Sequence, residues 1–377
     1  MTDNPEEQNK NPEITAKRYS ELKQKLSFGN SLLSFLIILI IFISGLSREL
    51  EKVSVNFSNN IYIAFLIFVA SIAVLDGILT FPLSFYSGYI LEHKYNLSNQ
   101  TLFSYFKEDL KGLAVGMVLG VPVLLVFYYI LRNYPHGWWY ITGIFLFFFS
   151  VLLARVAPVI IFPLFYKFKP VENQSLNNKI ISLCKKTGVT VGGIFTFDMS
   201  KDTKKANAAF TGMGKSKRII LGDTLLQNFT EDEIESIFAH ELGHYKMKHI
   251  LKLMFASTVF SFAGLYLISF IYSNTLILLH VDKLYTLSAL PLLLLYLSAF
   301  YFLVSPLSNF ISRKFEWQAD KYALETCSDN NNFASALEKL SSQNLSDKNP
   351  KKWIEILFHS HPSLGKRIEY ARNFNKQ

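Results

Sequence analysis

Six long apolar stretches constrain what this chain can fold into more than any other feature of its sequence. An apolar helix of roughly 20 residues crosses the hydrocarbon core of a membrane, and each stretch is long enough to do so. The stretches are residues 28–46, 61–85, 113–131, 138–162, 253–272 and 284–307. Only 18% of the residues are charged, against roughly 25% in soluble domains. The sequence therefore predicts an all-α membrane bundle of about six transmembrane helices.

Lysine and arginine are distributed unevenly between the two sides of this bundle. The side that carries both chain ends holds 33 of the 38 Lys and Arg residues, in segments 1–27, 86–112, 163–252 and 308–377. The opposite side holds 4 of them, in segments 47–60, 132–137 and 273–283. Because positive residues accumulate on the cytoplasmic side, we expect both termini and the large 163–252 segment in the cytoplasm. The net charge of +9 then requires no nucleic-acid partner.

The motif His240-Glu-Leu-Gly-His244 carries the strongest chemical signal in the chain. A capping-box pattern of Thr230 and Glu233 precedes it and predicts the start of a helix. Positions i and i+4 of a helix share a face, so both imidazoles can bind one metal ion. Glu241 is rotated away from them and is placed to take a proton from a zinc-bound water of lowered pKa. The alternative is a surface helix with two solvated histidines.

A catalytic zinc ion needs a third protein ligand and an open fourth position. Glu316 and Asp320 follow the last apolar stretch and are again spaced i, i+4 in a predicted helix. We expect Glu316 to be the third ligand of one zinc ion per chain, and Asp320 to accept a ring N–H from a ligand histidine. A surface pair of acidic residues is the alternative.

A loop near the C-terminus contains Ser360-His361-Pro362. Amide hydrolysis builds negative charge on the carbonyl oxygen, and His361 is the candidate to stabilise that charge, with Arg367 as its structural or electrostatic support. The alternative is a simple His-Pro turn.

Residues 206–221 predict a β-hairpin at a sheet edge, where an extended peptide could pair with the backbone. Asn207 and Ala208 are the candidate substrate-binding residues there. An ordinary hairpin whose Asn caps a turn remains equally open.

Two charged residues lie within the apolar stretches themselves. Asp76 belongs to the second stretch and Arg155 to the fourth, at similar depth from the outer ends. A charge exposed to lipid costs at least about 2.5–3.5 kcal/mol, so we expect both side chains to face an internal chamber or to pair with each other.

Taken together, these motifs resemble the type 1 CAAX prenyl endopeptidases, which are membrane-integrated zinc metallopeptidases. The resemblance also includes the strings at 82–86, 91–101, 157–158, 163–165 and 219–225. It implies a helical membrane bundle around a large water-filled chamber, closed on the cytoplasmic side by the zinc domain. It also implies cleavage near the C-terminus of prenylated peptides, and of other peptides by some members.

The resemblance assigns roles to residues of this chain. It implies zinc ligation by His240, His244 and Glu316, general-base catalysis by Glu241, and substrate or oxyanion contacts by the residues Asn207, His361 and Arg367. Two features depart from the family pattern. Eukaryotic members have seven spans rather than six, and residues 200–205 lack the expected Ser- and His-rich run. A shorter, bacterial-type member, whose substrates need not be prenylated, fits these departures.

The chain is expected to divide into five segments. These are a mobile N-terminal segment (1–27), transmembrane helices one to four (28–165), a zinc-peptidase region with the edge hairpin and the histidine-motif helix (166–252), transmembrane helices five and six (253–307), and the C-terminal part of the peptidase domain with the third ligand (308–377). The two polar regions together exceed 150 residues, enough for one α+β core. Cys184 and Cys327 indicate neither a disulfide framework nor a Cys-type zinc site.

The combined expectation is a multi-pass zinc endopeptidase that acts on peptides or lipidated peptides at the membrane–cytoplasm boundary. Its membrane would be the plasma or inner membrane of a bacterium, or the endoplasmic reticulum of a eukaryote. Eight residues separate His244 from Lys252, so a zinc helix that continued into the fifth span would hold the metal about 12 Å from the membrane. Two alternatives remain: a heat-shock-type quality-control protease, and a six-span transporter or scaffold with structural zinc.

Overall fold

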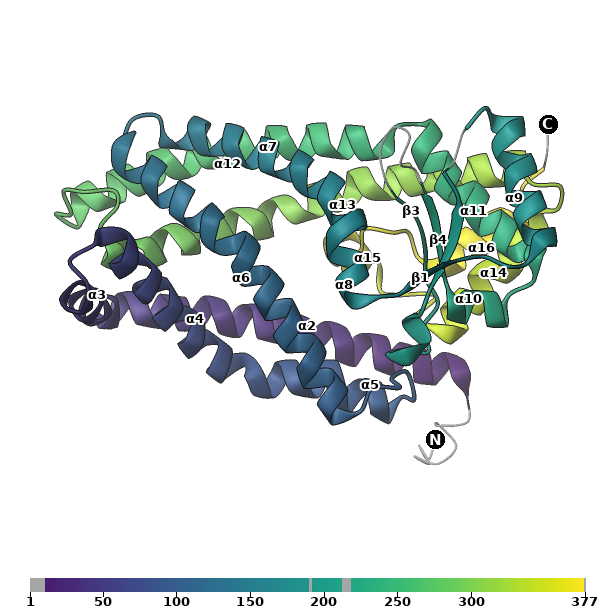
Figure 1. Cartoon of the computed structure of the whole chain (residues 1–377), viewed down its shortest axis with the longest axis horizontal. Coiled ribbons are helices and arrows are strands. Elements are labelled where there is room, and N and C mark those ends of the chain that lie inside the picture. Colours follow the sequence, from purple (N-terminus) through teal and green to yellow (C-terminus); the bar gives the residue numbers. More distant parts are fainter. Residues whose placement is uncertain (1–10, 190–191, 212–217, 376–377) are drawn as a thin grey trace.

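The structure is a computed structural model that describes residues 11–189, 192–211 and 218–375. Within these residues, six helices are long and apolar enough to cross a membrane, as predicted. Their α-helical parts are α2 (Pro12–Ile43), α4 (Ile61–Phe85), α6 (Leu102–Asn133), α7 (Trp138–Val156), α12 (His249–Leu278) and α13 (Leu290–Thr326). They form an elongated bundle, with a smaller domain that contains a sheet at one end (Figure 1).

Two of the spans continue beyond their α-helical part through a wider helical turn. These continuations are η1 (Tyr86–Ile90) and α5 (Leu91–Lys94) after α4, and η2 (Ala157–Ile161) and α8 (Phe162–Phe165) after α7. Pro158 lies within η2 and has no N–H to contribute to an α-helical ladder, a situation that favours local rearrangement of the helical hydrogen bonds. Both spans thereby extend further than the apolar stretches predicted.

The N-terminal segment predicted to be mobile is helical from Pro12 onward. Asn11 caps α2 by accepting a hydrogen bond from the backbone N–H of Glu13 at 3.0 Å. Tyr19 is buried and donates a hydrogen bond to Glu92 of α5 at 2.6 Å. The prediction is therefore wrong for residues 12–27, because partners distant in the sequence order this segment. Residues 1–10 lie outside the described part of the chain.

The end of the bundle far from the sheet is closed by short elements. These are α3 (Leu46–Phe57) and the 3₁₀ turn η5 (Leu287–Ala289). The carboxylate of Glu51 in α3 accepts hydrogen bonds from the backbone N–H groups of Leu287 and Ser288, each at 3.2 Å. Nearby, Phe65 of α4 stacks on Tyr128 of α6 with ring centroids 4.2 Å apart. The first contact therefore links α3 to the segment that precedes the last span, and the second links the second span to the third.

The domain at the other end contains a four-stranded mixed sheet in the order β1-β2-β4-β3. The strands are β1 (Phe168–Pro170), β2 (Ile194–Phe197), β3 (Ala208–Thr211) and β4 (Arg218–Gly222). Strands β2 and β4 are parallel, and the other two pairs are antiparallel. The two strands of the predicted hairpin are β3 and β4, and β3 is an edge strand. The turn between them lies outside the described residues.

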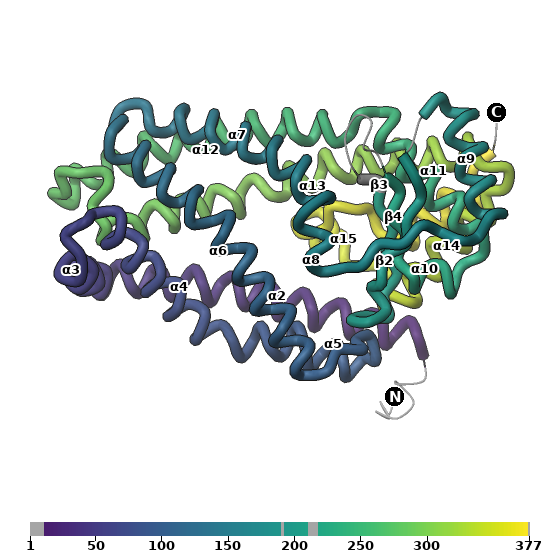
Figure 2. The backbone as a smooth tube through the Cα atoms, viewed as in Figure 1, coloured from purple at the N-terminus to yellow at the C-terminus, as the bar shows by residue number. Residues whose placement is uncertain are grey.

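Helices pack around this sheet and complete an α+β domain, so the predicted fold class is confirmed. They are α9 (Gln174–Thr187), α10 (Asp223–Asn228), α11 (Glu231–Lys246), α14 (Asn330–Gln343), α15 (Lys352–Phe358) and α16 (Leu364–Arg372), with the 3₁₀ turn η3 (Met199–Lys201). The core includes Ile180, Phe238 and Phe333, each at most 2% exposed. Figure 2 shows α13 running from the bundle into this domain. Cys184 and Cys327 are both buried.

Candidate metal and catalytic site

The helix that carries the histidine motif is fixed at its start by the predicted capping box. The Thr230 backbone N–H donates to Glu233 at 2.8 Å, and the Glu233 N–H donates to the Thr230 hydroxyl at 3.3 Å. Ser335 and Lys339 of α14 also donate to the Glu233 carboxylate, at 2.6 and 2.7 Å. Burial alone would raise the pKa of Glu233, but the hydrogen bonds from Lys339, Ser335 and the Thr230 backbone together with the charge of Lys339 outweigh burial and hold the pKa below its usual range. The start of α11 is thus anchored to α14.

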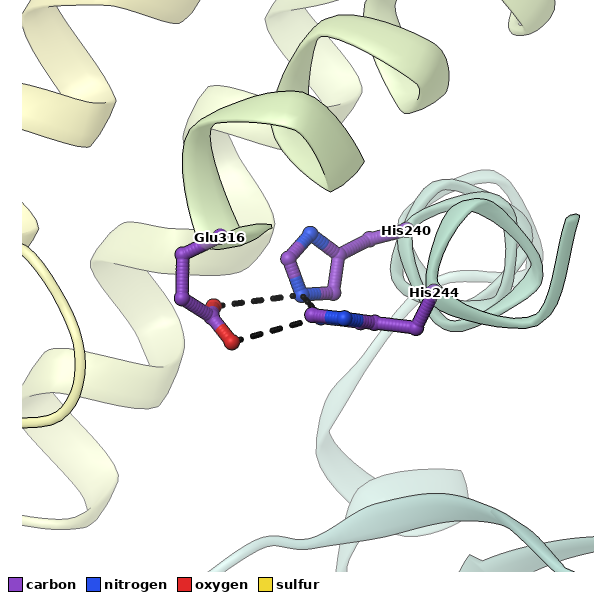
Figure 3. Close-up of side chains that lie close together, drawn as sticks. All are labelled: His240, His244 and Glu316. Atoms are coloured by element: carbon purple, nitrogen blue, oxygen red, sulfur yellow. Dashed lines mark hydrogen bonds and ion pairs between the residues drawn. The ribbon is translucent and has the colours of Figure 1, made fainter. Parts of the chain in front are cut away.

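His240, His244 and Glu316 converge on one point between α11 and α13 (Figure 3). The Nε2 atoms of the two histidines lie 3.1 Å apart. Glu316 Oε2 lies 3.4 Å from His240 Nε2, and Glu316 Oε1 lies 3.2 Å from His244 Nε2. A tetrahedral zinc ion with bonds of about 2.0–2.1 Å holds neighbouring donors about 3.3 Å apart. The three donors therefore have the spacing of a zinc site.

A second observation supports a cation at this position. Glu316 is 5% exposed, and its Oε2 is a buried oxygen without a hydrogen-bond partner among the described residues; a long ion pair of 3.5 Å to Nη1 of Arg367 is its contact with a cation. A buried carboxylate oxygen is costly unless it is hydrogen-bonded or coordinates a metal. Two imidazole nitrogens and one carboxylate, with one direction left open, are also the donor set of catalytic zinc sites. The residues present fit zinc.

The outer nitrogen of His240 is held by a buried ion pair. Asp320 Oδ1 lies 2.8 Å from His240 Nδ1, and Arg367 of α16 donates two hydrogen bonds to the Asp320 carboxylate at 2.6 and 2.8 Å. Asp320 is fully buried and Arg367 is 6% exposed. The short hydrogen bonds of Arg367 go to Asp320, because α16 packs against α13. The expected structural or electrostatic support of His361 by Arg367 stays a prediction.

The charges around His240 set its protonation in the metal-free protein. Burial alone would lower the pKa of His240, but its hydrogen bonds to Asp320 and Glu316 outweigh burial and raise the pKa to about 9. Burial would likewise lower the pKa of Arg367, and the charge of Asp320 raises it instead. Arg367 therefore remains cationic at every physiological pH. A metal ion must displace the His240 proton in order to bind.

The other catalytic candidates surround the same point. His361 Nε2 lies 3.3 Å from Glu316 Oε1, and 62% of the side chain is exposed to the cavity. Removal from bulk water and the charge of Arg367 lower the pKa of His361, although Glu316 opposes this effect. The ring is therefore neutral at pH 7. Glu241 is half-buried and lines the same cavity.

The substrate-binding candidates lie at the edge of the sheet. Asn207 and Ala208 both line the cavity, and the Asn207 side chain is exposed there. The Asn207 carbonyl accepts a hydrogen bond from the N–H of Gly222 at 2.9 Å. The backbone at the start of β3 is thereby fixed beside the metal site.

The cavity extends from the site far into the membrane bundle. Its volume is about 1940 Å³. One wall is the polar face of α2, with Ser27, Ser31 and Ser34, and another is the segment of α13 around Tyr301 and Phe302. A chamber of this size accommodates an extended peptide together with a large apolar group.

The two charged residues within the spans do not pair. Asp76 accepts a hydrogen bond from Ser34 of α2 at 2.6 Å, and no ion pair joins Asp76 to Arg155, both of which lie in the described part of the chain. The pairing expected as one alternative is not formed, because α4 packs against α2 and α6 whereas α7 packs against α12 and α6. The Arg155 side chain is exposed.

The zinc helix does not continue into the fifth span. α11 ends at Lys246, and Lys248 has a left-handed backbone conformation (φ 56°) that separates α11 from α12. α12 then begins at His249, five residues after His244. The site still lies at the end of the bundle, but a turn rather than a continuous helix makes the connection.

Two residues near the site were not singled out from the sequence. His249 is fully buried beside His244, with their Nδ1 atoms 3.0 Å apart. Arg313 donates hydrogen bonds to the carbonyls of Glu355 and His359, at 3.0 and 2.6 Å, and braces the loop that carries His361. The position of His249 directly after the motif was a usable signal, whereas no local pattern predicts the contacts of Arg313.

Comparisons with known proteins agree with this geometry. A family model described as "Peptidase family M48" matches residues 170–375, and one described as "CAAX prenyl protease N-terminal, five membrane helices" matches residues 10–167. The chain is 32% identical to an uncharacterized metalloprotease, YhfN, of Bacillus subtilis, over 94% of this chain and 84% of the relative. It is 33% identical to CAAX prenyl protease 1 of Saccharomyces cerevisiae, over 80% and 71%.

A solved structure is similar over almost the whole chain. The crystal structure of S. mikatae Ste24p superposes with a TM-score of 0.86 at 27% sequence identity, and the match covers 96% of this chain and 89% of the other. The similarity therefore includes both the membrane bundle and the domain with the sheet. The matches favour the prenyl-protease branch over the heat-shock type, and they exclude a transporter or scaffold.

Proposed function

Because the chain belongs to peptidase family M48 and is a membrane metalloendopeptidase of the CAAX prenyl protease type, we propose that it hydrolyses peptide bonds with a zinc ion held by His240, His244 and Glu316. The observation that carries the proposal is the spacing of the three donor atoms, 3.1–3.4 Å, beside the buried and unsatisfied Glu316 Oε2. A bound zinc ion would lower the pKa of a water molecule and polarise the scissile carbonyl.

The chain's own residues supply the proton transfers. Glu241 lies next to the ligand His240 in α11 and faces the cavity. Its carboxylate accepts a proton from the attacking water and returns it to the leaving amine, as a general base and then a general acid. Asp320 and Arg367 hold the His240 ring in the orientation that leaves Nε2 free for the metal.

His361 is suited to stabilise the developing oxyanion. Its Nδ1 lies 3.0 Å from the Ser360 hydroxyl. If this hydroxyl donates to Nδ1, the neutral ring carries its proton on Nε2. That N–H points toward the Glu316 side of the site, where the carbonyl oxygen of a bound substrate would lie. A preorganised donor of this kind is worth about 10²–10³ in kcat.

An extended peptide can pair with the sheet edge beside these groups. Strand β3 is the edge strand, and Asn207 and Ala208 at its start line the cavity. Backbone pairing gives affinity without strong side-chain selection, so it suits cleavage of several sequences. Asn207 would hold the substrate backbone through its amide.

We further propose that the substrates are membrane-tethered peptides, including lipidated ones. The chamber reaches from Glu241 into the bundle between α2 and α13, and so offers space for an apolar group next to a peptide. A relative at 33% identity is named CAAX prenyl protease 1. Comparing kcat/KM for a farnesylated peptide and its unmodified counterpart tests this; equal values would count against lipid recognition.

The peptidase end of the bundle is proposed to face the cytoplasm. The described parts of the four segments rich in Lys and Arg lie toward the end with the sheet, and the three poor segments lie at the α3 end (Figure 2). The positive-inside rule orients such a bundle with the rich end in the cytoplasm. The orientation is tested by introducing a cysteine at Ser58 and labelling it from the outside of intact cells.

The catalytic proposal is tested by separating metal binding from turnover. Glu241→Gln should retain one zinc ion per chain and lose peptide cleavage by several orders of magnitude, because only the base is removed. Glu325→Gln is the matched control, since Glu325 is exposed and pairs with Lys321 on the same helix. Cleavage by Glu241→Gln at the wild-type rate would refute the role of Glu241.

A further inference from the structure

His249, which lies outside the histidine motif, is bonded to the outer nitrogen of a proposed metal ligand. His244 directs Nε2 toward His240 and Glu316, and its other nitrogen, Nδ1, lies 3.0 Å from His249 Nδ1. The second nitrogen of His249, Nε2, lies 2.9 Å from Oε1 of Gln318 in α13. A chain of two hydrogen bonds therefore runs from His244 to Gln318.

The protons in this chain can be arranged in only one way if His244 is to bind a metal. A metal-facing Nε2 must be unprotonated, so neutral His244 carries its proton on Nδ1 and donates it to His249. His249 Nδ1 is then the acceptor, and the His249 proton sits on Nε2, where Gln318 Oε1 accepts it. The reverse direction would need a proton on His244 Nε2 and would block the metal. The acceptor oxygen of Gln318 thus selects the ligating tautomer.

The surrounding structure keeps His249 in this position. Its side chain is fully buried, and its ring stacks on Phe315 with centroids 4.4 Å apart and planes 6° from parallel. The left-handed Lys248 reverses the chain between α11 and α12, which brings His249 back against His244. The ring is therefore fixed before a metal arrives.

We propose that His249 is a positioning residue, which fixes the tautomer and orientation of His244 through a hydrogen-bond relay that ends at Gln318. The two ligand histidines are then held by different means. His240 is held by the anionic Asp320 at 2.8 Å, and His244 by the neutral His249. Helix α13 supplies the proposed ligand Glu316. It also supplies Asp320, which holds His240, and Gln318, which ends the relay that holds His244. The inference rests on the proposed metal site.

The test compares His249→Phe with His249→Asn. Phenylalanine keeps the volume and the stacking on Phe315 but offers no acceptor, whereas the Asn oxygen can occupy the position of His249 Nδ1. The zinc dissociation constant is measured by competition with a chelator, together with kcat, KM and the melting temperature of the metal-free protein. His249→Phe should weaken zinc binding by about 10–100-fold, and His249→Asn should recover most of that loss.

Further variants keep the test decisive. Gln318→Leu removes the terminal acceptor of the relay and leaves both histidines in place, so it should also weaken zinc binding. If His249→Phe does not fold, the zinc affinity of Gln318→Leu tests the relay instead. Tyr272→Phe is the matched control. Tyr272 is a buried residue of α12, the helix that begins with His249, and the substitution removes its hydrogen bond to the Leu284 carbonyl, away from the site. It should leave zinc affinity unchanged.

Two results would overturn the relay. One is wild-type zinc affinity in both His249→Phe and Gln318→Leu, with only the melting temperature lowered. The other is a loss in His249→Phe that His249→Asn does not reduce. Failure of the proposed metal site can be distinguished from failure of the relay. If the metal site were wrong, Glu316→Gln would bind zinc as tightly as the wild type.

Discussion

Gly243 lies so close to Ala319 that a β-carbon on Gly243 would be 3.1 Å from the Ala319 α-carbon. The same β-carbon would also lie 3.1 Å from Cβ of Tyr322. These contacts join α11 to α13 one residue before the ligand His244 and three residues after the ligand Glu316. The close approach of the two backbones is what allows a carboxylate from one helix to reach two imidazoles on the other.

Gly243→Ala should therefore weaken zinc binding without removing a ligand. The added methyl group meets backbone atoms, and relief of such overpacking typically costs about 1–3 kcal/mol, which corresponds to roughly 5–150-fold in affinity if it falls on the metal-bound state. Chelator competition measures the change. Gly116→Ala is the control, because a β-carbon there meets no atom within 4 Å. Equal zinc affinity in Gly243→Ala and wild type would contradict this account of the helix contact.

Asp320→Asn should lower both zinc affinity and stability. The substitution weakens the support of His240 Nδ1, which should cost about 10–100-fold in zinc affinity. It also removes the closer of the two carboxylates beside the buried Arg367 and leaves only the longer contact to Glu316, at 3.5 Å; breaking a buried ion pair destabilises a protein by up to about 3–5 kcal/mol. Glu338→Gln is the control, since Glu338 pairs with Arg372 on the surface and such pairs contribute about 1 kcal/mol or less. If both variants behave alike, the Asp320–Arg367 pair is not the support we describe.

Zinc binding should become tighter as the pH rises toward 9. In the metal-free protein the pKa of His240 is raised to about 9, so at lower pH each bound zinc displaces one proton from this ring. The apparent association constant then increases up to about tenfold per pH unit below pH 9 and levels off above it. Chelator competition between about pH 7 and pH 10 measures the slope. An affinity independent of pH over this range would show that His240 is not protonated in the metal-free protein.

His361→Phe should reduce kcat while zinc stays bound. The His361 side chain is exposed in the cavity and 3.3 Å from Glu316, so its loss removes an oxyanion donor but no metal ligand. A decrease of about 10²–10³ in kcat is expected. His361→Gln should recover part of it, because the Gln amide can place a donor near the position of Nε2. Loss of zinc from His361→Phe, or full activity, would argue against this role.

The sequence predicted the parts of the fold that depend on local patterns. Long apolar runs define the six spans, and the capping box of Thr230 and Glu233 defines the start of α11. The spacing of His240 and His244 places both rings on one helical face, so the motif by itself indicates a pair of metal ligands. The i, i+4 spacing of Glu316 and Asp320 indicates a second shared face for the same reason.

Most of the contacts that the sequence did not predict join residues distant in the sequence. The N-terminal segment is ordered because Tyr19 and Lys23 bind Glu92, and no local pattern reveals that partner. The hydrogen bonds from Arg367 to Asp320 depend on how α16 packs against α13. The turn at Lys248, which places His249 beside His244, carries neither Gly nor Asn, the usual signals of a left-handed residue.

The most direct test of the central claim is anomalous diffraction at the zinc absorption edge from crystals of the zinc-loaded protein. The account predicts one peak per chain, about 2.0–2.1 Å from Nε2 of His240 and of His244 and about 2.0–2.2 Å from a carboxylate oxygen of Glu316. A peak elsewhere, or an ion at the histidines that Glu316 does not contact, would contradict it.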